Sequence, residues 1–147
     1  MALATTRLEI VSPDKVVYSE DVRMVIVRST GGELGILPKH APLVTGLEPH
    51  ALRVKFEDAR DDQLIACAGG FMEVTPEKVT VLATAAEAPV DIDVNRAQRA
   101  FDRARERLEK FKAGPQEVRE SIDEKRAELA LMRAMARLTA SGTEYSL

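Results

Sequence analysis

Short runs of apolar residues, separated by turn signals about every ten residues, dominate the chain between residues 8 and 86. Leu52, Val54 and Phe56 alternate with charged residues, a period of two that is typical of a half-buried strand. Residues 22–27 form a nearly continuous apolar run, which predicts a strand covered on both faces. This regular spacing of short strands favours an all-β sandwich or barrel.

The hydrophobic period becomes helical after residue 93. A first apolar stripe consists of Ala97, Ala100, Phe101, Ala104, Leu108 and Phe111. Asp91 or Asp93 can cap its start, and Gly114-Pro115 ends it. A second stripe over residues 118–138 predicts one further helix, and the short break between the two stripes predicts an antiparallel hairpin. The tail after Thr139 is expected to be frayed.

These patterns predict an α+β chain, with a β-sandwich domain at residues 1–88 and a helical hairpin domain at residues 89–147. The apolar stripes of the hairpin are narrow and rich in alanine, so the hairpin alone should be only marginally stable. The hairpin must therefore pack against the β-sandwich, bind a partner or alternate between these two states. Bistable elements of this kind make switches.

The charge of the chain changes sign along its length, although the net charge is only −3. Residues 1–92 carry nine Lys/Arg and fourteen Asp/Glu, whereas residues 93–140 carry twelve and nine, which suggests two parts with different partners. The acidic total gives no reason to expect a nucleic-acid partner. No apolar stretch approaches the roughly 20 residues that cross a bilayer, so we expect a soluble, intracellular protein without direct membrane insertion. We expect Cys67 to be a buried, inert thiol.

No catalytic constellation is apparent in the sequence. The glycine-rich segment 31–47 has neither the spacing of a phosphate loop nor that of a dinucleotide-binding motif, and it is interpreted as a tightly folded connection. His40 and His50 have no partners at metal-ligand spacing, so no metal site is expected. Asp61-Asp62 is interpreted as a solvated loop. The sequence therefore predicts a protein that is not an enzyme in its own right and that needs no obligatory cofactor.

Five distinctive motifs follow one another along the chain. They are Leu8-Glu9-Ile10-Val11-Ser12-Pro13-Asp14-Lys15 with Val17-Tyr18, Gly32-Glu33-Leu34-Gly35-Ile36-Leu37-Pro38 with His40-Ala41-Pro42-Leu43, Ala68-Gly69-Gly70-Phe71-Met72-Glu73-Val74 followed by Val79-Thr80-Val81-Leu82-Ala83, Asp91-Ile92-Asp93 with Arg96-Ala97, and Arg133-Ala134-Met135-Ala136-Arg137-Leu138. Together they resemble the motifs of the epsilon subunits of bacterial F-type ATP synthases. The resemblance covers roughly residues 8–138.

The resemblance implies a β-sandwich of about ten strands that docks on the gamma subunit and the membrane c-ring. It implies a hairpin that can fold against the sandwich or extend along gamma to the alpha and beta subunits, where it blocks ATP hydrolysis. The chain would then be a non-catalytic rotor subunit that couples proton-driven rotation to ATP synthesis. Its place would be peripheral, on the cytoplasmic face of the bacterial cell membrane.

Three arginines are predicted to converge on the hairpin. Arg96 lies eighteen residues before Gly114 and Arg133 eighteen after Pro115, so in an antiparallel hairpin both sit roughly 27 Å from the turn. Arg137 follows Arg133 by one turn on the same face. Convergent guanidinium groups suit phosphate recognition.

In some epsilon subunits this region binds ATP as a regulatory ligand. The resemblance implies a ligand-contacting set of Glu87, Asp93, Arg96, Arg133 and Arg137. The alternative is that Asp93 caps the helix and pairs with Arg96, while the other arginines face the acidic sandwich. Two other interpretations of the chain stay open: a free-standing ATP-binding sensor module, and an unrelated small enzyme with a β-sandwich.

Overall fold

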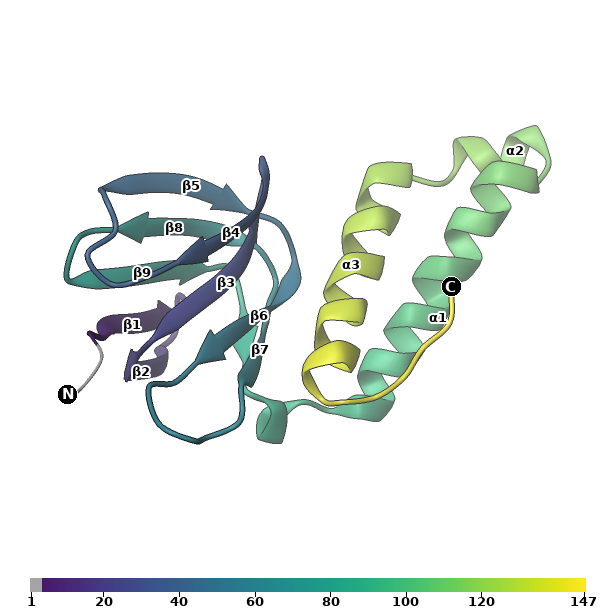
Figure 1. Cartoon of the computed structure of the whole chain (residues 1–147). Coiled ribbons are helices and arrows are strands. Elements are labelled where there is room, and N and C mark those ends of the chain that lie inside the picture. Colours follow the sequence, from purple (N-terminus) through teal and green to yellow (C-terminus); the bar gives the residue numbers. More distant parts are fainter. Residues whose placement is uncertain (1–3) are drawn as a thin grey trace.

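The computed structural model describes residues 4–147, in which a β-rich part precedes a helical part (Figure 1). The strands of this region are β1 Thr6–Val11, β2 Val16–Val22, β3 Met24–Ser29, β4 Gly32–Ile36, β5 Leu43–Leu47, β6 His50–Lys55, β7 Gln63–Cys67, β8 Gly70–Val74, β9 Lys78–Ala83 and β10 Ala86–Glu87. A 3-10 turn, η1 (Pro89–Asp91), leads to the helices α1 Val94–Ala113, α2 Gln116–Glu120 and α3 Glu124–Ala140.

The strands form one hydrogen-bonded sheet that folds over into two layers. Their order is β10-β7-β6-β3-β5-β8-β9-β1-β2, with β4 on the free side of β3. All pairs are antiparallel except β1 with β9. The link between β3 and β5 is a single pair, Ser29 with Leu47, and there the sheet turns from one layer to the other. The predicted N-terminal sandwich of about ten strands is therefore confirmed.

The space between the layers is filled almost entirely by aliphatic side chains. Fully buried members include Leu8, Ile65 and Met72, and none of the core residues comes from the helices. Cys67 belongs to this core, as predicted, and burial raises the pKa of its thiol. The sandwich therefore has a complete core of its own, without the hairpin.

The apolar run at residues 22–27 was predicted to be one strand covered on both faces, which is wrong. β2 ends at Val22 and β3 begins at Met24, with the chain turning between them. In β3, Val25 and Val27 are buried in the core, whereas Met24 and Ile26 are only half-buried. The run appears continuous because two strands meet in it.

The hairpin differs from prediction in its second arm. Asp93 caps α1, accepting a hydrogen bond from the backbone N–H of Arg96 at 3.0 Å. The stripe over residues 118–138 is not one helix, because the chain leaves helical geometry between α2 and α3. Asp123 then caps α3 by accepting from the backbone N–H of Arg126 at 3.1 Å. The hydrophobic period continues across the break, but this cap starts a new helix.

The hairpin lies against the sandwich mainly through α3 (Figure 1), and Val94 at the start of α1 packs against the same contact. Ala136 and Ala140 on α3 pack with Ala66 of β7 and with Ile92, while Ala134 and Leu138 face α1. The predicted frayed tail is wrong, because α3 extends to Ala140 and the following residues return along α1. Among residues 4–147, no helix has the length and apolar character needed to cross a bilayer.

Candidate functional site

A pocket of about 410 Å³ opens between α1 and α3, beside the last strand of the sandwich. It is lined by Glu87, Asp91, Asp93, Arg96, Ala97, Ala100, Arg103, Ala130, Arg133 and Arg137. Its volume lies in the range of small-molecule sites. Because its walls come from β10, η1 and both long helices, the pocket exists only while the hairpin is folded against itself and the sandwich.

An ion pair joins the two domains at this pocket. Arg137 Nε donates to Glu87 Oε1 at 2.6 Å, and less than a third of either side chain is exposed. The contact runs from β10 to the last turn of α3. Glu87 therefore holds one arginine in position and offsets part of its charge.

The other predicted arginines have no such partner. The Asp93 carboxylate accepts from the backbone N–H of Arg96, not from its guanidinium. Within residues 4–147, the side chains of Arg96 and Arg133 make no hydrogen bond or ion pair. Two cationic side chains thus line the pocket without a direct ion pair, although carboxylates line the same pocket.

All five residues predicted from the sequence line this pocket. The inference that Arg96 and Arg133 lie level relied on an unbroken second helix, which the structure lacks. The two residues still line one pocket, because α1 and α3 pack against each other despite the break.

Two family models match the chain in succession. Residues 5–89 match the model "ATP synthase, Delta/Epsilon chain, beta-sandwich domain", and residues 91–142 match "ATP synthase, Delta/Epsilon chain, long alpha-helix domain". The chain belongs to the ATP synthase delta/epsilon chain family.

Relatives of nearly equal length support this membership. The chain is 49% identical over 140 residues to an ATP synthase epsilon chain of Halalkalibacterium halodurans, and 46% identical over 140 residues to that of Bacillus pumilus. Each alignment covers 95% of this chain and 99% of the relative. The predicted assignment to epsilon subunits is confirmed.

A solved structure agrees with the fold. A chain from the mitochondrial ATP synthase of Euglena gracilis, solved as OSCP/F1/c-ring, superposes with a TM-score of 0.70 at 25% identity. The match covers 95% of this chain and 82% of that one.

One arginine of the pocket, Arg103, was not predicted from the sequence. Arg103 lies two helical turns after Arg96 on the same face of α1, and Ala97 and Ala100 line the floor between them. The spacing of seven residues was available in the sequence. Four arginines and three carboxylates therefore surround the pocket.

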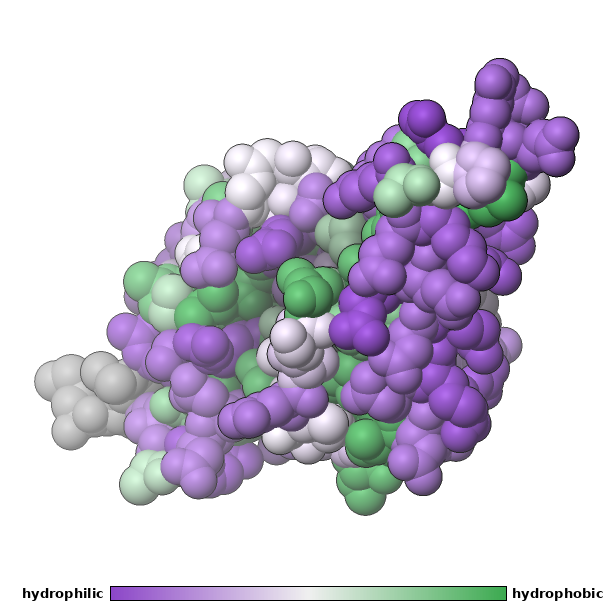
Figure 2. Space-filling model, turned by 90° about the vertical axis from the view of Figure 1, so that its right-hand side faces the viewer, coloured by the Kyte–Doolittle hydropathy of each residue, from purple (hydrophilic) through white to green (hydrophobic). Residues whose placement is uncertain are grey.

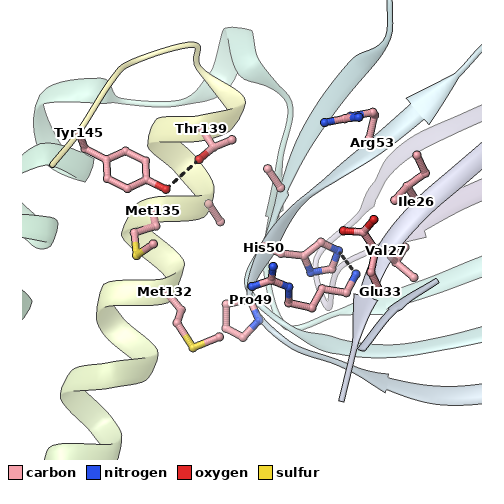
Figure 3. Close-up of a pocket in the computed structure, with 13 residues that line it drawn as sticks. Ile26, Val27, Glu33, Pro49, His50, Arg53, Met132, Met135, Thr139 and Tyr145 are labelled. Carbon is pink, nitrogen blue, oxygen red and sulfur yellow. Dashed lines mark hydrogen bonds between the residues drawn. The ribbon is translucent and has the colours of Figure 1, made fainter. Parts of the chain in front are cut away.

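His50, which sequence reasoning left without a role, lies in a second groove of about 260 Å³ between α3 and the sandwich (Figure 3). Its Nδ1 contacts the carbonyl of Glu48 at 2.6 Å, and its Nε2 accepts from the backbone N–H of Arg28 at 3.0 Å. These bonds require a neutral imidazole with the proton on Nδ1. Burial lowers the pKa of His50. Among the described residues no group of three or more His, Cys, Asp or Glu could hold a metal ion.

Proposed function

We propose that this chain is a non-catalytic central-stalk subunit of an F-type ATP synthase that couples proton-driven rotation to ATP synthesis. Its hairpin restrains ATP hydrolysis, and ATP is the regulatory ligand that favours the folded hairpin. The observation that carries the ATP proposal is the set of Arg96, Arg103 and Arg133 guanidinium groups. They line one pocket without an ion-pair partner among residues 4–147.

The chemistry of the pocket fits a polyphosphate. Guanidinium groups bind phosphate oxygens through two parallel hydrogen bonds, and here they come from both helices. A triphosphate between α1 and α3 would replace cation repulsion by attraction on both arms. Such a ligand stabilises the folded hairpin only by its preference for that state, and a hundredfold preference corresponds to roughly 2.7 kcal/mol.

For the sandwich we propose docking on the gamma subunit and the c-ring. Val44, Phe71 and Leu82 are exposed on β5, β8 and β9, and the strand register puts them on one face. Adjacent exposed apolar side chains favour a protein partner. The Euglena gracilis relative was solved with the c-ring. This docking would keep the chain peripheral to the cytoplasmic face of the bacterial membrane.

For the hairpin we propose contact with the alpha and beta subunits in an extended state. Figure 2 views the side that carries the hairpin and shows mainly hydrophilic residues over α1. Lys125 and Arg126 are exposed at the start of α3. Each solvent-exposed ion pair contributes roughly 0–1 kcal/mol to the free energy of such a contact, and salt screens it. Neutralising both residues should therefore relieve inhibition most clearly at low salt.

The ATP proposal is tested by calorimetric titration of the isolated chain with Mg-ATP. Arg96→Ala and Arg133→Ala should each weaken binding about tenfold or more, because each removes charge-assisted hydrogen bonds of roughly 1.5–3 kcal/mol. Arg99→Ala is the matched control, since Arg99 is exposed on α1 and does not line the pocket. Equal affinities in all four proteins would end the ATP proposal.

The rotor proposal has a separate test. A chain ending at residue 89 should fold and still bind gamma, because the sandwich core contains no hairpin residue. In a reconstituted enzyme it should raise ATP hydrolysis relative to the full chain, and unchanged hydrolysis would remove the inhibitory role. If the chain binds ATP but does not co-purify with gamma, the free-standing sensor module is the better description. ATP turnover by the purified chain would favour the enzyme interpretation.

A further inference from the structure

The residues after α3 form a defined turn that sends the chain back along α1 (Figure 1). Gly142 has a φ of 78°, in the left-handed region that favours glycine. Its N–H donates to the carbonyl of Thr139 at 3.1 Å, and the N–H of Thr143 donates to the carbonyl of Leu138 at 2.9 Å. This pair of bonds is the Schellman arrangement, which ends a helix and fixes the direction of the following chain.

Tyr145 contacts both arms of the hairpin. Its ring lies 5.3 Å from that of Phe101 on α1, centroid to centroid, at an interplanar angle of 55°. Its hydroxyl lies 3.3 Å from Oγ1 of Thr139 on α3, the contact drawn in Figure 3. Phe101 is only 1% exposed, and Tyr145 is one of the side chains packed against its cluster. The tail thus completes the apolar contact between the helices.

A second contact ties the tail to α1. Arg105 Nη1 donates to the backbone carbonyl of Ser146 at 3.0 Å. The Arg105 guanidinium also lies 5.5 Å from the centre of the Phe101 ring. Phe101 is therefore contacted by Arg105 from its own helix and by Tyr145 from the tail.

We propose that residues 141–147 are a latch that holds α1 against α3. The turn at Gly142 attaches Tyr145 rigidly to the end of α3, while its ring packs on α1. The helices cannot separate unless the contact between Tyr145 and Phe101 breaks. The latch consists of one ring contact and a few exposed hydrogen bonds, so it opens without leaving a charged group buried. Its effect on hydrolysis rests on the proposed inhibitory role of the hairpin, whereas its effect on the isolated chain does not.

Native-state hydrogen exchange of the isolated chain tests the latch. In Tyr145→Ala the amides of α1 around Phe101 should exchange roughly threefold to tenfold faster than in wild type, because an aromatic pair is lost. Exchange in the sandwich should not change. Glu144→Ala is the matched control, because Glu144 is exposed in the same tail. Tyr145→Phe keeps the ring and should retain most of the protection.

The result that overturns the latch is equal exchange of α1 amides in Tyr145→Ala and Glu144→Ala. A second measurement separates this failure from failure of the proposed function. In a reconstituted enzyme, Tyr145→Ala should lower ATP hydrolysis at fixed ATP, because the hairpin extends more readily. Faster exchange with unchanged hydrolysis would support the latch and contradict the inhibitory hairpin. Loss of protection in the sandwich as well would contradict the latch, which acts only between the helices.

Discussion

The contact between hairpin and sandwich should fail selectively when Ala136 is enlarged. Ala136 is 4% exposed and packs against Ala66 of β7 and Ile92. It does not belong to the cluster that joins α3 to α1, nor to the core of the sandwich. Ala136→Leu therefore places three extra carbons between two bodies that are each otherwise complete.

The expected magnitude follows from the near-complete burial of Ala136. Inserting methylene groups into a packed contact costs typically about 1–3 kcal/mol. In a protein with two hairpin positions, a change of that size shifts the equilibrium by roughly 5- to 150-fold. Undocking of the hairpin relieves the overlap at position 136. The free-energy cost of the substitution therefore shifts the equilibrium between docked and undocked hairpin and does not unfold the chain. The shift is of the same order as the effect expected from a ligand with a hundredfold preference.

Small-angle X-ray scattering and hydrogen exchange on the isolated chain measure the effect. Ala136→Leu should increase the radius of gyration and speed exchange in α3, and leave the sandwich core protected. Ala113→Leu is the matched control, because Ala113 is exposed at the end of α1. If the two variants behave alike, the alanine contact does not hold the hairpin in solution. Unfolding of the sandwich in Ala136→Leu would equally refute the reasoning, since no hairpin residue belongs to its core.

Three further predictions concern titration, capping and backbone conformation. Burial lowers the pKa of His50 in the folded chain, so on acidification the imidazole takes up a proton in the unfolded chain before it does in the folded one. The free energy of unfolding should therefore fall as the pH drops below about 6.5. Urea titrations at several pH values should show this, and His50→Gln should flatten it. Asp93→Ala and Asp123→Ala should each cost about 1 kcal/mol of helix stability, because each removes an N-cap. Amide exchange should become faster in the first turn of α1 for Asp93→Ala and of α3 for Asp123→Ala, and faster exchange that is not confined to the helix concerned would contradict the capping roles. Gly70→Ala should lower the melting temperature far more than Gly32→Ala. Both glycines have a positive φ, but only a Cβ at Gly70 would meet the Leu82 carbonyl. Equal decreases in melting temperature would show that backbone strain, and not the close approach to Leu82, sets the cost.

The sandwich was predictable because its pattern is local and repeated. Alternation in strands such as β6 reports which side chains face the core, and Leu52 and Val54 are indeed fully buried. The order of the strands could not be obtained this way, since pairs such as parallel β1 with β9 join segments about seventy residues apart. Phe56 continues the alternation but follows the end of β6 and is only half-buried. Alternation thus predicts a face better than it predicts where a strand ends.

The residues of the site could be predicted where they lie on the same face of a single helix. Arg96 and Arg103 share a face of α1, but the spacing that connects them was not used, whereas Arg133 and Arg137 were found. The pairing of Arg137 with Glu87 depends on how α3 docks on β10, which no local pattern encodes. The break before Asp123 and the return of Tyr145 onto Phe101 were missed for related reasons. A capping residue can interrupt an apolar stripe without disturbing its period, and a ring contact across 44 residues leaves no trace in a short window.

The way the hairpin is attached explains how a weak signal could move it. Its contact with the sandwich is centred on three alanines, Ala66, Ala136 and Ala140, which pack beside Ile92 and the half-buried Leu64. One ion pair, between Arg137 and Glu87, adds to it. Each alanine offers one methyl group, worth about 0.8 kcal/mol when buried, whereas a leucine or phenylalanine would offer about 1.5–3 kcal/mol. Because the sandwich core contains no hairpin residue, undocking of the hairpin would leave that core covered. An attachment made of large side chains would exceed what a nucleotide with a hundredfold preference can offset. Under the proposed ATP regulation, this alanine-rich contact would keep the two hairpin positions close enough in free energy for a nucleotide in the arginine-lined pocket to decide between them.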